Sequence, residues 1–144
     1  MPGSDVDLFG GIGDDLRLAN PISADLDVMR PSILPNLVAA AKRNADRGYP
    51  DAGLFEVGPA YRDDSPSGQD AVAAGLRHGN SGPRHWRDQP TATSVFDAKA
   101  DVCAVLASVG APVDNLQIDA EAPAWYHPGR SGTLRLGKAA LGFF

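Results

Sequence analysis

One segment of the sequence combines basic and aromatic side chains in the way that binding of single-stranded RNA requires. Residues 77–87 (RHGNSGPRHWR) contain three arginines, two histidines and a tryptophan, and no acidic residue. Guanidinium groups neutralise phosphates, and an indole ring stacks on an unpaired base. The segment is therefore a candidate RNA contact through Arg77, Arg84, Trp86 and Arg87. The alternative is a solvated loop in which Trp86 folds back onto the core.

Other side chains of reactive type lack the spacing that their chemistry needs. The three histidines and the single cysteine, Cys103, show neither the CxxC nor the HExxH spacing of zinc sites. Ser131 stands in the string Gly-Arg-Ser-Gly, which is not the Gly-x-Ser-x-Gly turn of hydrolases. We therefore expect no metal site and no serine nucleophile, and we expect Cys103 to be a packed side chain.

The composition narrows the class of protein. With 144 residues, 43% of them hydrophobic, the chain is long enough for one domain, and no apolar run approaches the ~20 residues of a membrane helix. The net charge of −5 disfavours DNA and leaves any RNA contact to a local basic patch. The first residues lack the features of a signal peptide, so we expect a cytoplasmic protein.

Apolar spacing predicts two helices. The first covers residues 32–47, with Ser32 able to cap its start and Gly48 ending it. The second covers residues 98–109, with Asp97 as the expected N-cap.

Five strands are expected between and after these helices. Residues 53–61 and 71–77 predict an antiparallel hairpin, because the turn-forming string DDSPSGQD joins them. Three further strands are expected over residues 115–119, 131–136 and 140–144. This pattern predicts an α+β fold with an antiparallel sheet flanked by helices, over residues 16–144. The Gly-rich residues 1–15 are expected to be a linker or an unstructured segment, and the apolar last strand predicts that the chain is part of a longer one.

Three strings then indicate a family. They are residues 20–62, which begin NPISADLDVMRPSILP, residues 95–102 (VFDAKADV) and residues 125–131 (WYHPGRS). In this order and at this spacing, they resemble the β subunits of bacterial phenylalanyl-tRNA synthetases. Because several separate motifs stand in register, the resemblance is more specific than one short pattern.

The resemblance implies a non-catalytic domain with the class II synthetase fold, in the C-terminal half of a longer β subunit. Its expected partner is the catalytic α subunit, in an (αβ)2 heterotetramer that joins phenylalanine to tRNA(Phe). The whole enzyme uses ATP and Mg²⁺, whereas this segment is expected to hold no cofactor or metal and to be inactive alone. Contact with tRNA is expected, if anywhere, at the basic segment.

The resemblance also singles out Arg62. The string Tyr61-Arg62-Asp63-Asp64 stands where class II synthetases have an arginine that clamps the α-phosphate of ATP. The string AVAAGLR that follows has no aromatic ring for adenine, and the second signature arginine, in Gly-x-Gly-x-x-Arg, is missing. We therefore expect Arg62 to be a remnant of the ATP motif, without catalytic residues around it.

Two interpretations of Arg62 remain open. In the first, it forms a structural ion pair with Asp63, Asp64 or Glu56. In the second, it retains residual binding of ATP or an adenylate. The resemblance further predicts that residues 125–131 form a turn that buries an aromatic side chain, and that Arg30 braces the segment before the first helix.

Overall fold

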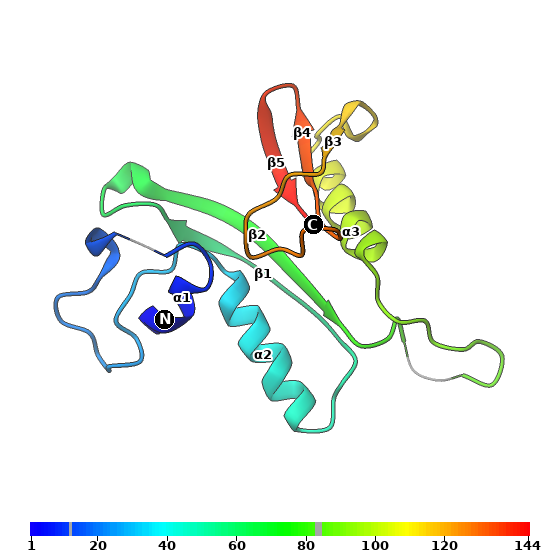
Figure 1. Cartoon of the computed structure of the whole chain (residues 1–144), viewed down its shortest axis with the longest axis horizontal. Coiled ribbons are helices and arrows are strands. Elements are labelled where there is room, and N and C mark those ends of the chain that lie inside the picture. Colours follow the sequence, from blue (N-terminus) through cyan, green and yellow to red (C-terminus); the bar gives the residue numbers. More distant parts are fainter. Residues whose placement is uncertain (12, 83–84) are drawn as a thin grey trace. The chain divides into compact units, whose positions relative to one another are not determined.

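The computed structural model describes residues 1–11, 13–82 and 85–144. They form two compact units, Met1–Pro90 and Thr91–Phe144 (Figure 1). The division proposed from the sequence, 1–15 and 16–144, has different boundaries.

The first unit is organised by helix α2 (Leu34–Asp46). The Ser32 hydroxyl accepts a hydrogen bond from the backbone N–H of Leu34, at 3.2 Å, and Pro35 lies in the first turn, where its missing N–H costs nothing. Gly48 has a φ of +88°, a conformation that favours glycine, and the helix ends just before it. The helix predicted over residues 32–47 is therefore confirmed.

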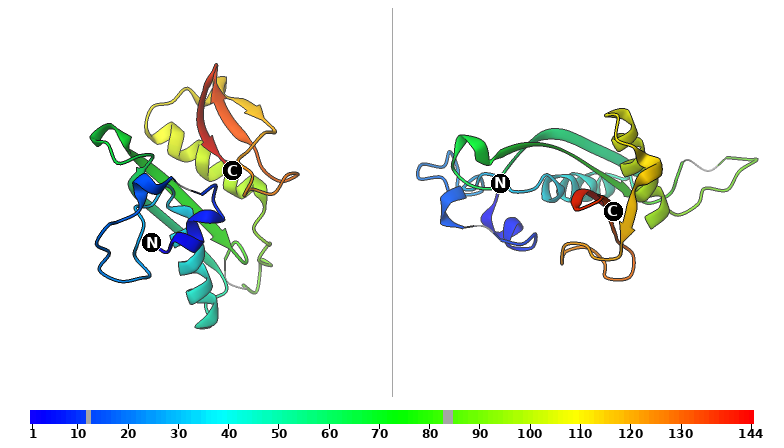
Figure 2. Two further views of the ribbon diagram at one scale, coloured as in Figure 1. Left: turned by 60° about the vertical axis from the view of Figure 1, so that its left-hand side comes forward. Right: turned by 90° about the horizontal axis from the view of Figure 1, so that it is seen from above.

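Strands β1 (Ala52–Tyr61) and β2 (Gln69–His78) form an antiparallel hairpin, with a short 3-10 helix (Pro66–Gly68) in its turn. The register pairs Ala52 with His78 at one end and Tyr61 with Gln69 at the other. Helix α2 packs on this hairpin (Figure 2). Both strands alternate between less and more exposed residues, as expected when only one face of a sheet is covered. The predicted hairpin is confirmed.

The first residues of the chain contribute to the core of this unit. They contain helix α1 (Gly3–Asp7) and a 3-10 helix (Asp14–Leu16). Val6 is fully buried, in one cluster with Leu16 and Val28. The amino group of Met1 donates a hydrogen bond to the carbonyl of Val28 at 2.9 Å. The sequence had suggested a linker or an unstructured segment for residues 1–15, whereas Val6 is one of the most buried side chains of the unit.

The second unit begins with helix α3 (Val95–Ser108). Ser94 is its N-cap, and Asp97 at the third helical position completes a capping box by accepting bonds from the Ser94 N–H and hydroxyl, both at 2.7 Å. The predicted start at residue 98 with Asp97 as the N-cap is therefore wrong. Asp97 lies inside the first turn of the helix and forms the capping box together with Ser94.

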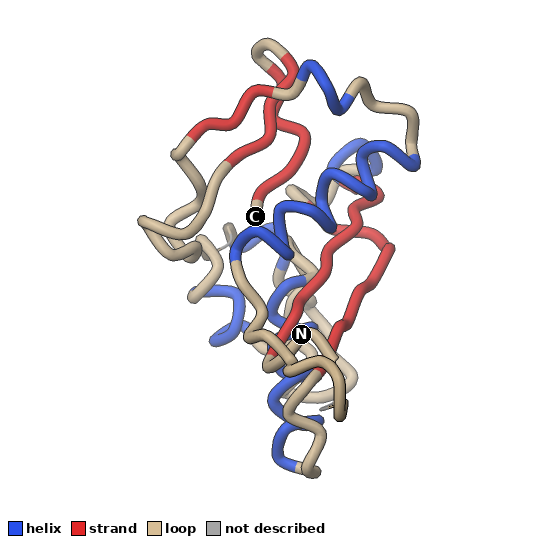
Figure 3. Tube along the Cα trace, turned by 90° about the vertical axis from the view of Figure 1, so that its right-hand side faces the viewer, coloured by secondary structure: helices blue, strands red, loops and turns tan. Residues whose placement is uncertain are grey.

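A three-stranded antiparallel sheet completes this unit. Its strands are β3 (Gln117–Asp119), β4 (Thr133–Leu136) and β5 (Ala139–Phe143), in the order β3-β4-β5. Gly137 has a φ of +60° in the tight turn between β4 and β5. Helix α3 contacts β5, and Leu134 is the most buried apolar side chain of the sheet. Figure 3 shows these last strands in red, leading to the C-terminus.

The α+β class with antiparallel strands is therefore confirmed. The described strands form two separate sheets, of two and three strands, rather than the one sheet that was expected. None of the helices in the described ranges is long and apolar enough to cross a membrane.

Candidate functional site

Arg30 fixes strand β1, which leads directly to Arg62, the candidate remnant of the ATP motif. Its guanidinium pairs with the carboxylate of Glu56 and donates a bond from Nε to the carbonyl of Pro59, at 2.9 Å. Its own carbonyl accepts a bond from the N–H of Tyr61, also at 2.9 Å. A Cβ on Gly58 would lie 2.7 Å from Nη2 of Arg30, so a larger residue at this strand position would make the guanidinium shift from its present place. Arg30 thus braces β1 over most of its second half.

Arg62 follows directly after that braced strand and spans the hairpin turn. Its Nε lies 2.8 Å from Oδ2 of Asp70, and Nη2 donates to the carbonyl of Ser67 at 3.0 Å. Its backbone N–H donates to the carbonyl of Gly68 at 2.8 Å. The expected ion pair of Arg62 is present, but its partner is Asp70 rather than the predicted Asp63, Asp64 or Glu56, because the turn brings β2 back beside Arg62.

Asp63 organises the inside of the same turn. Its Oδ1 accepts hydrogen bonds from the hydroxyl and from the N–H of Ser65, the latter at 2.9 Å. These two bonds, with a smaller contribution from the Arg62 charge, lower the pKa of the Asp63 carboxyl. A Cβ on Gly68 would collide with this carboxylate, so the turn also requires glycine there.

The arrangement suits a brace better than an anion clamp. Two guanidinium donors of Arg62 are already bonded within the turn. The side chains of the ion pair are 66% and 51% exposed, so it contributes no more than about 1 kcal/mol to stability. Strand β2 carries no phenylalanine, tyrosine or tryptophan that could stack on a base beside Arg62.

Among the candidate RNA residues that the structure describes, Arg77 lies at the opposite end of the hairpin, and Trp86 and Arg87 lie in the loop that follows β2. Arg77 pairs with Gly53 in the register, and Trp86 is 88% exposed, with its ring centroid 5.5 Å from that of His85. The backbone N–H of Arg87 donates to Nδ1 of His85 at 3.2 Å. Arg84 lies outside the described residues. The alternative in which Trp86 folds back onto the core is therefore wrong.

No metal site is evident in the described ranges, where no three His, Cys, Asp or Glu residues are grouped to hold an ion. Cys103 is a free, half-buried thiol on α3.

The sequence analysis missed an apolar surface on the hairpin. We define the outer hairpin face as Phe55, Val57 and Pro59 with their register partners Gly75, Ala73 and Ala71. Phe55 is 82% exposed and Val57 is 70% exposed. Both alternating residue sets of β1 contain apolar side chains, so the strand pattern alone did not show which set is covered by α2.

The family model and the known proteins that are similar to this chain all indicate the same family. A model of the family described as the phenylalanyl tRNA synthetase beta chain CLM domain matches residues 4–144. The phenylalanine–tRNA ligase beta subunit of Paramagnetospirillum magneticum is 57% identical over 144 residues, which are 100% of this chain and 18% of that relative.

Two other relatives carry the same name. The protein of Rhodospirillum rubrum is 59% identical over 136 residues, covering 94% of this chain and 17% of the relative. The protein of Mesorhizobium japonicum is 52% identical over 149 residues, covering 100% of this chain and 19% of the relative. The chain therefore spans less than a fifth of the length of these relatives.

Replacing the hydroxyl that bonds Asp63 is expected to raise the pKa of this carboxyl. In Ser65→Ala the largest cause of the lowered pKa is removed, so titration of the Asp63 carboxyl carbon by NMR should move toward the ordinary range of aspartate. The lowered pKa also stabilises the folded turn at neutral pH, and this contribution is lost as the pH falls through the folded-state pKa. Ser4→Ala, in α1, is the control and should leave the titration unchanged. An unchanged Asp63 titration in Ser65→Ala would show that the bond has no effect.

Proposed function

Because the chain belongs to the family of the phenylalanyl-tRNA synthetase beta chain CLM domain, we propose that it is a structural, non-catalytic segment of a phenylalanine–tRNA ligase β subunit. Its role is to support assembly with the catalytic α subunit in an (αβ)2 heterotetramer. That enzyme charges tRNA(Phe) with phenylalanine in the cytoplasm, using ATP and Mg²⁺ held outside this segment. The segment corresponds to a class II synthetase-like domain in the C-terminal half of the subunit and is inactive alone.

The outer hairpin face is the observation that carries this proposal. Exposed apolar side chains gathered on one regular surface are typical of a surface that another polypeptide covers. Phe55 and Val57 stand opposite Gly75 and Ala73, so the large side chains project from a flat floor of small ones. Helix α2 already gives the two strands the support that an isolated hairpin lacks, so the outer hairpin face is left for a partner to cover.

The identity of the relatives as beta subunits supports the choice of partner. Each relative is a beta subunit, and a beta subunit assembles with at least one other kind of subunit. The outer hairpin face has no charged residue among its six positions, which fits the apolar centre of a lasting subunit interface.

Arg62 takes a structural role in this proposal. It is a remnant of an ATP motif that now braces the hairpin turn through Asp70 and Ser67. The exposed apolar face therefore keeps its shape before the partner arrives, which limits the ordering cost of assembly.

Introducing a charge on the outer hairpin face is expected to weaken assembly with the α subunit. The full-length β subunit carrying Phe55→Asp should bind the α subunit at least about tenfold more weakly, because a charge would be buried in an apolar interface. Ile22→Asp is the matched control, since Ile22 is 99% exposed in a loop of the same unit. Binding is measured by analytical ultracentrifugation. Equal affinities of the Phe55→Asp and Ile22→Asp subunits would contradict the proposed docking role.

A second candidate function, tRNA contact, is favoured by the exposure of Trp86. An indole that is 88% exposed, beside Arg87 and on the same segment as Arg77, is available to stack on an unpaired base. The assembly role remains the leading proposal, because the chain as a whole carries a net charge of −5.

Removing this indole is expected to weaken tRNA binding. Trp86→Ala should reduce the affinity of the β subunit for tRNA about tenfold, the effect of losing one stacked base. Phe96→Ala is the control, since Phe96 is 76% exposed and lies in the other unit. Affinity is measured by fluorescence anisotropy at several salt concentrations. Binding that Trp86→Ala leaves unchanged would exclude the segment as a stacking site.

A further inference from the structure

The turn that joins α2 to β1 lies at the end of the hairpin from which the basic segment, residues 77–87, leaves the sheet (Figure 1). Nδ1 of His78, the last residue of β2, lies 2.6 Å from the carbonyl oxygen of Pro50. Oδ1 of Asp51 accepts hydrogen bonds from the backbone N–H of Asn80 at 2.7 Å and from its side chain at 3.2 Å. These contacts hold the turn after α2 beside the start of the basic segment.

The end of α2 and the turn that follows it carry unpaired positive charge. Arg43 and Arg47 are exposed and stand four positions apart, so they lie on the same side of the helix end. Neither of them takes part in an ion pair within the described ranges. The two carboxylates of this stretch are already engaged, because Asp46 lies 2.8 Å from Nζ of Lys42 and Asp51 accepts the bonds described above. The two guanidinium groups are therefore available to an anionic ligand.

Tyr49 adds an exposed aromatic ring to this turn. It is 68% exposed and follows Gly48, whose φ is +88°. Its backbone N–H donates to the carbonyl of Asn44 at 3.0 Å, which ties the residue to the last turn of α2. An exposed ring on a fixed backbone can stack on a base with little further loss of entropy. The helix dipole accounts for positive charge at the end of α2, but it does not account for this ring.

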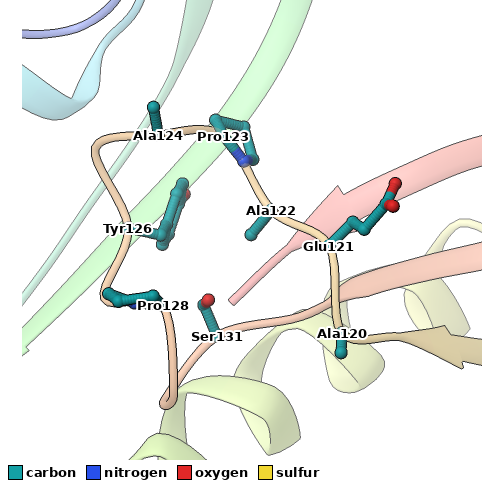
Figure 4. Close-up of a pocket in the computed structure, with 8 residues that line it drawn as sticks. All are labelled: Ala120, Glu121, Ala122, Pro123, Ala124, Tyr126, Pro128 and Ser131. Atoms are coloured by element: carbon teal, nitrogen blue, oxygen red, sulfur yellow. The ribbon is translucent and has the colours of Figure 1, made fainter.

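Tyr126, in the loop between β3 and β4, shows the contrast with a packed tyrosine. It is half-buried, its ring centroid lies 6.3 Å from that of Phe143, and burial raises the pKa of its phenol. Figure 4 shows its ring turned toward the inside of the loop. Tyr126 is thus the aromatic side chain that residues 125–131 bury, as the sequence predicted. In the described part of the chain, no contact between aromatic rings involves Tyr49.

We propose that Arg43, Arg47 and Tyr49, beside the start of the basic segment, bind an unpaired stretch of tRNA. The inference rests on the second candidate function, tRNA contact at Trp86, and extends it to the end of α2. The guanidinium groups neutralise phosphates of the strand, and the Tyr49 ring stacks on one of its bases. Guanidinium groups without carboxylate partners, next to an exposed ring, suit a ligand that has both phosphates and flat bases better than they suit an acidic protein surface.

Binding of labelled tRNA to the full-length β subunit, measured by fluorescence anisotropy at several salt concentrations, tests this surface. The double variant Arg43→Gln/Arg47→Gln should bind about tenfold more weakly. The slope of log affinity against log salt concentration should become shallower by about 1.4, the value for two phosphate contacts on a single strand. Tyr49→Ala should weaken binding about tenfold, whereas Tyr49→Phe, which keeps the ring, should retain it.

The double variant Arg130→Gln/Lys138→Gln is the matched control, because it removes two positive charges at exposed positions of the second unit. It should leave the affinity and the slope unchanged. An unchanged slope in Arg43→Gln/Arg47→Gln would overturn the inference, and so would weaker binding of the α subunit in place of weaker tRNA binding. If Trp86→Ala alone weakens tRNA binding, this inference fails and the second candidate function stands. If none of the variants weakens it, both fail, and the assembly role, which rests on the outer hairpin face, is unaffected.

Discussion

The hairpin depends on the clamp that Arg30 forms on strand β1. One residue supplies a carbonyl for the N–H of Tyr61 and a guanidinium for the Pro59 carbonyl and the Glu56 carboxylate. These contacts tie the segment before α2 to a strand that follows more than twenty residues later. These contacts bond the Pro59 carbonyl and the Tyr61 N–H near the end of β1, as a further strand would do in a larger sheet. The turn that contains Arg62 begins at this end of β1.

Clamping from one side leaves the other side of the hairpin free. Helix α2 packs on the hairpin, whereas Phe55 and Val57 on the outer hairpin face remain exposed. Arg62, at the end of β1, is bonded within its own turn to Asp70 and Ser67. The hairpin thus presents a regular apolar surface, as the proposed assembly role requires, and its strand β2 carries no phenylalanine, tyrosine or tryptophan that could stack on adenine beside Arg62.

Local signals in the sequence predicted most of the elements, and contacts between distant residues account for the errors. Helix α2 and the hairpin follow from apolar spacing and turn residues, which act over a few positions. The partner of Arg62 depends on how β2 returns, and the burial of Val6 depends on Val28, so neither follows from local pattern. The face of the hairpin that stays exposed also depends on α2. The start of α3 was misplaced because Asp97 caps from inside the helix, together with Ser94.

The claim that the hairpin is structural rather than catalytic is tested most directly by calorimetric titration of the 144-residue chain with ATP and Mg²⁺. Arg62 is bonded to Asp70 and Ser67, and β2 offers no aromatic ring for adenine. We therefore expect no saturable heat of binding. Saturable binding that disappears in Arg62→Ala would contradict it and would show that the hairpin retains a working nucleotide site.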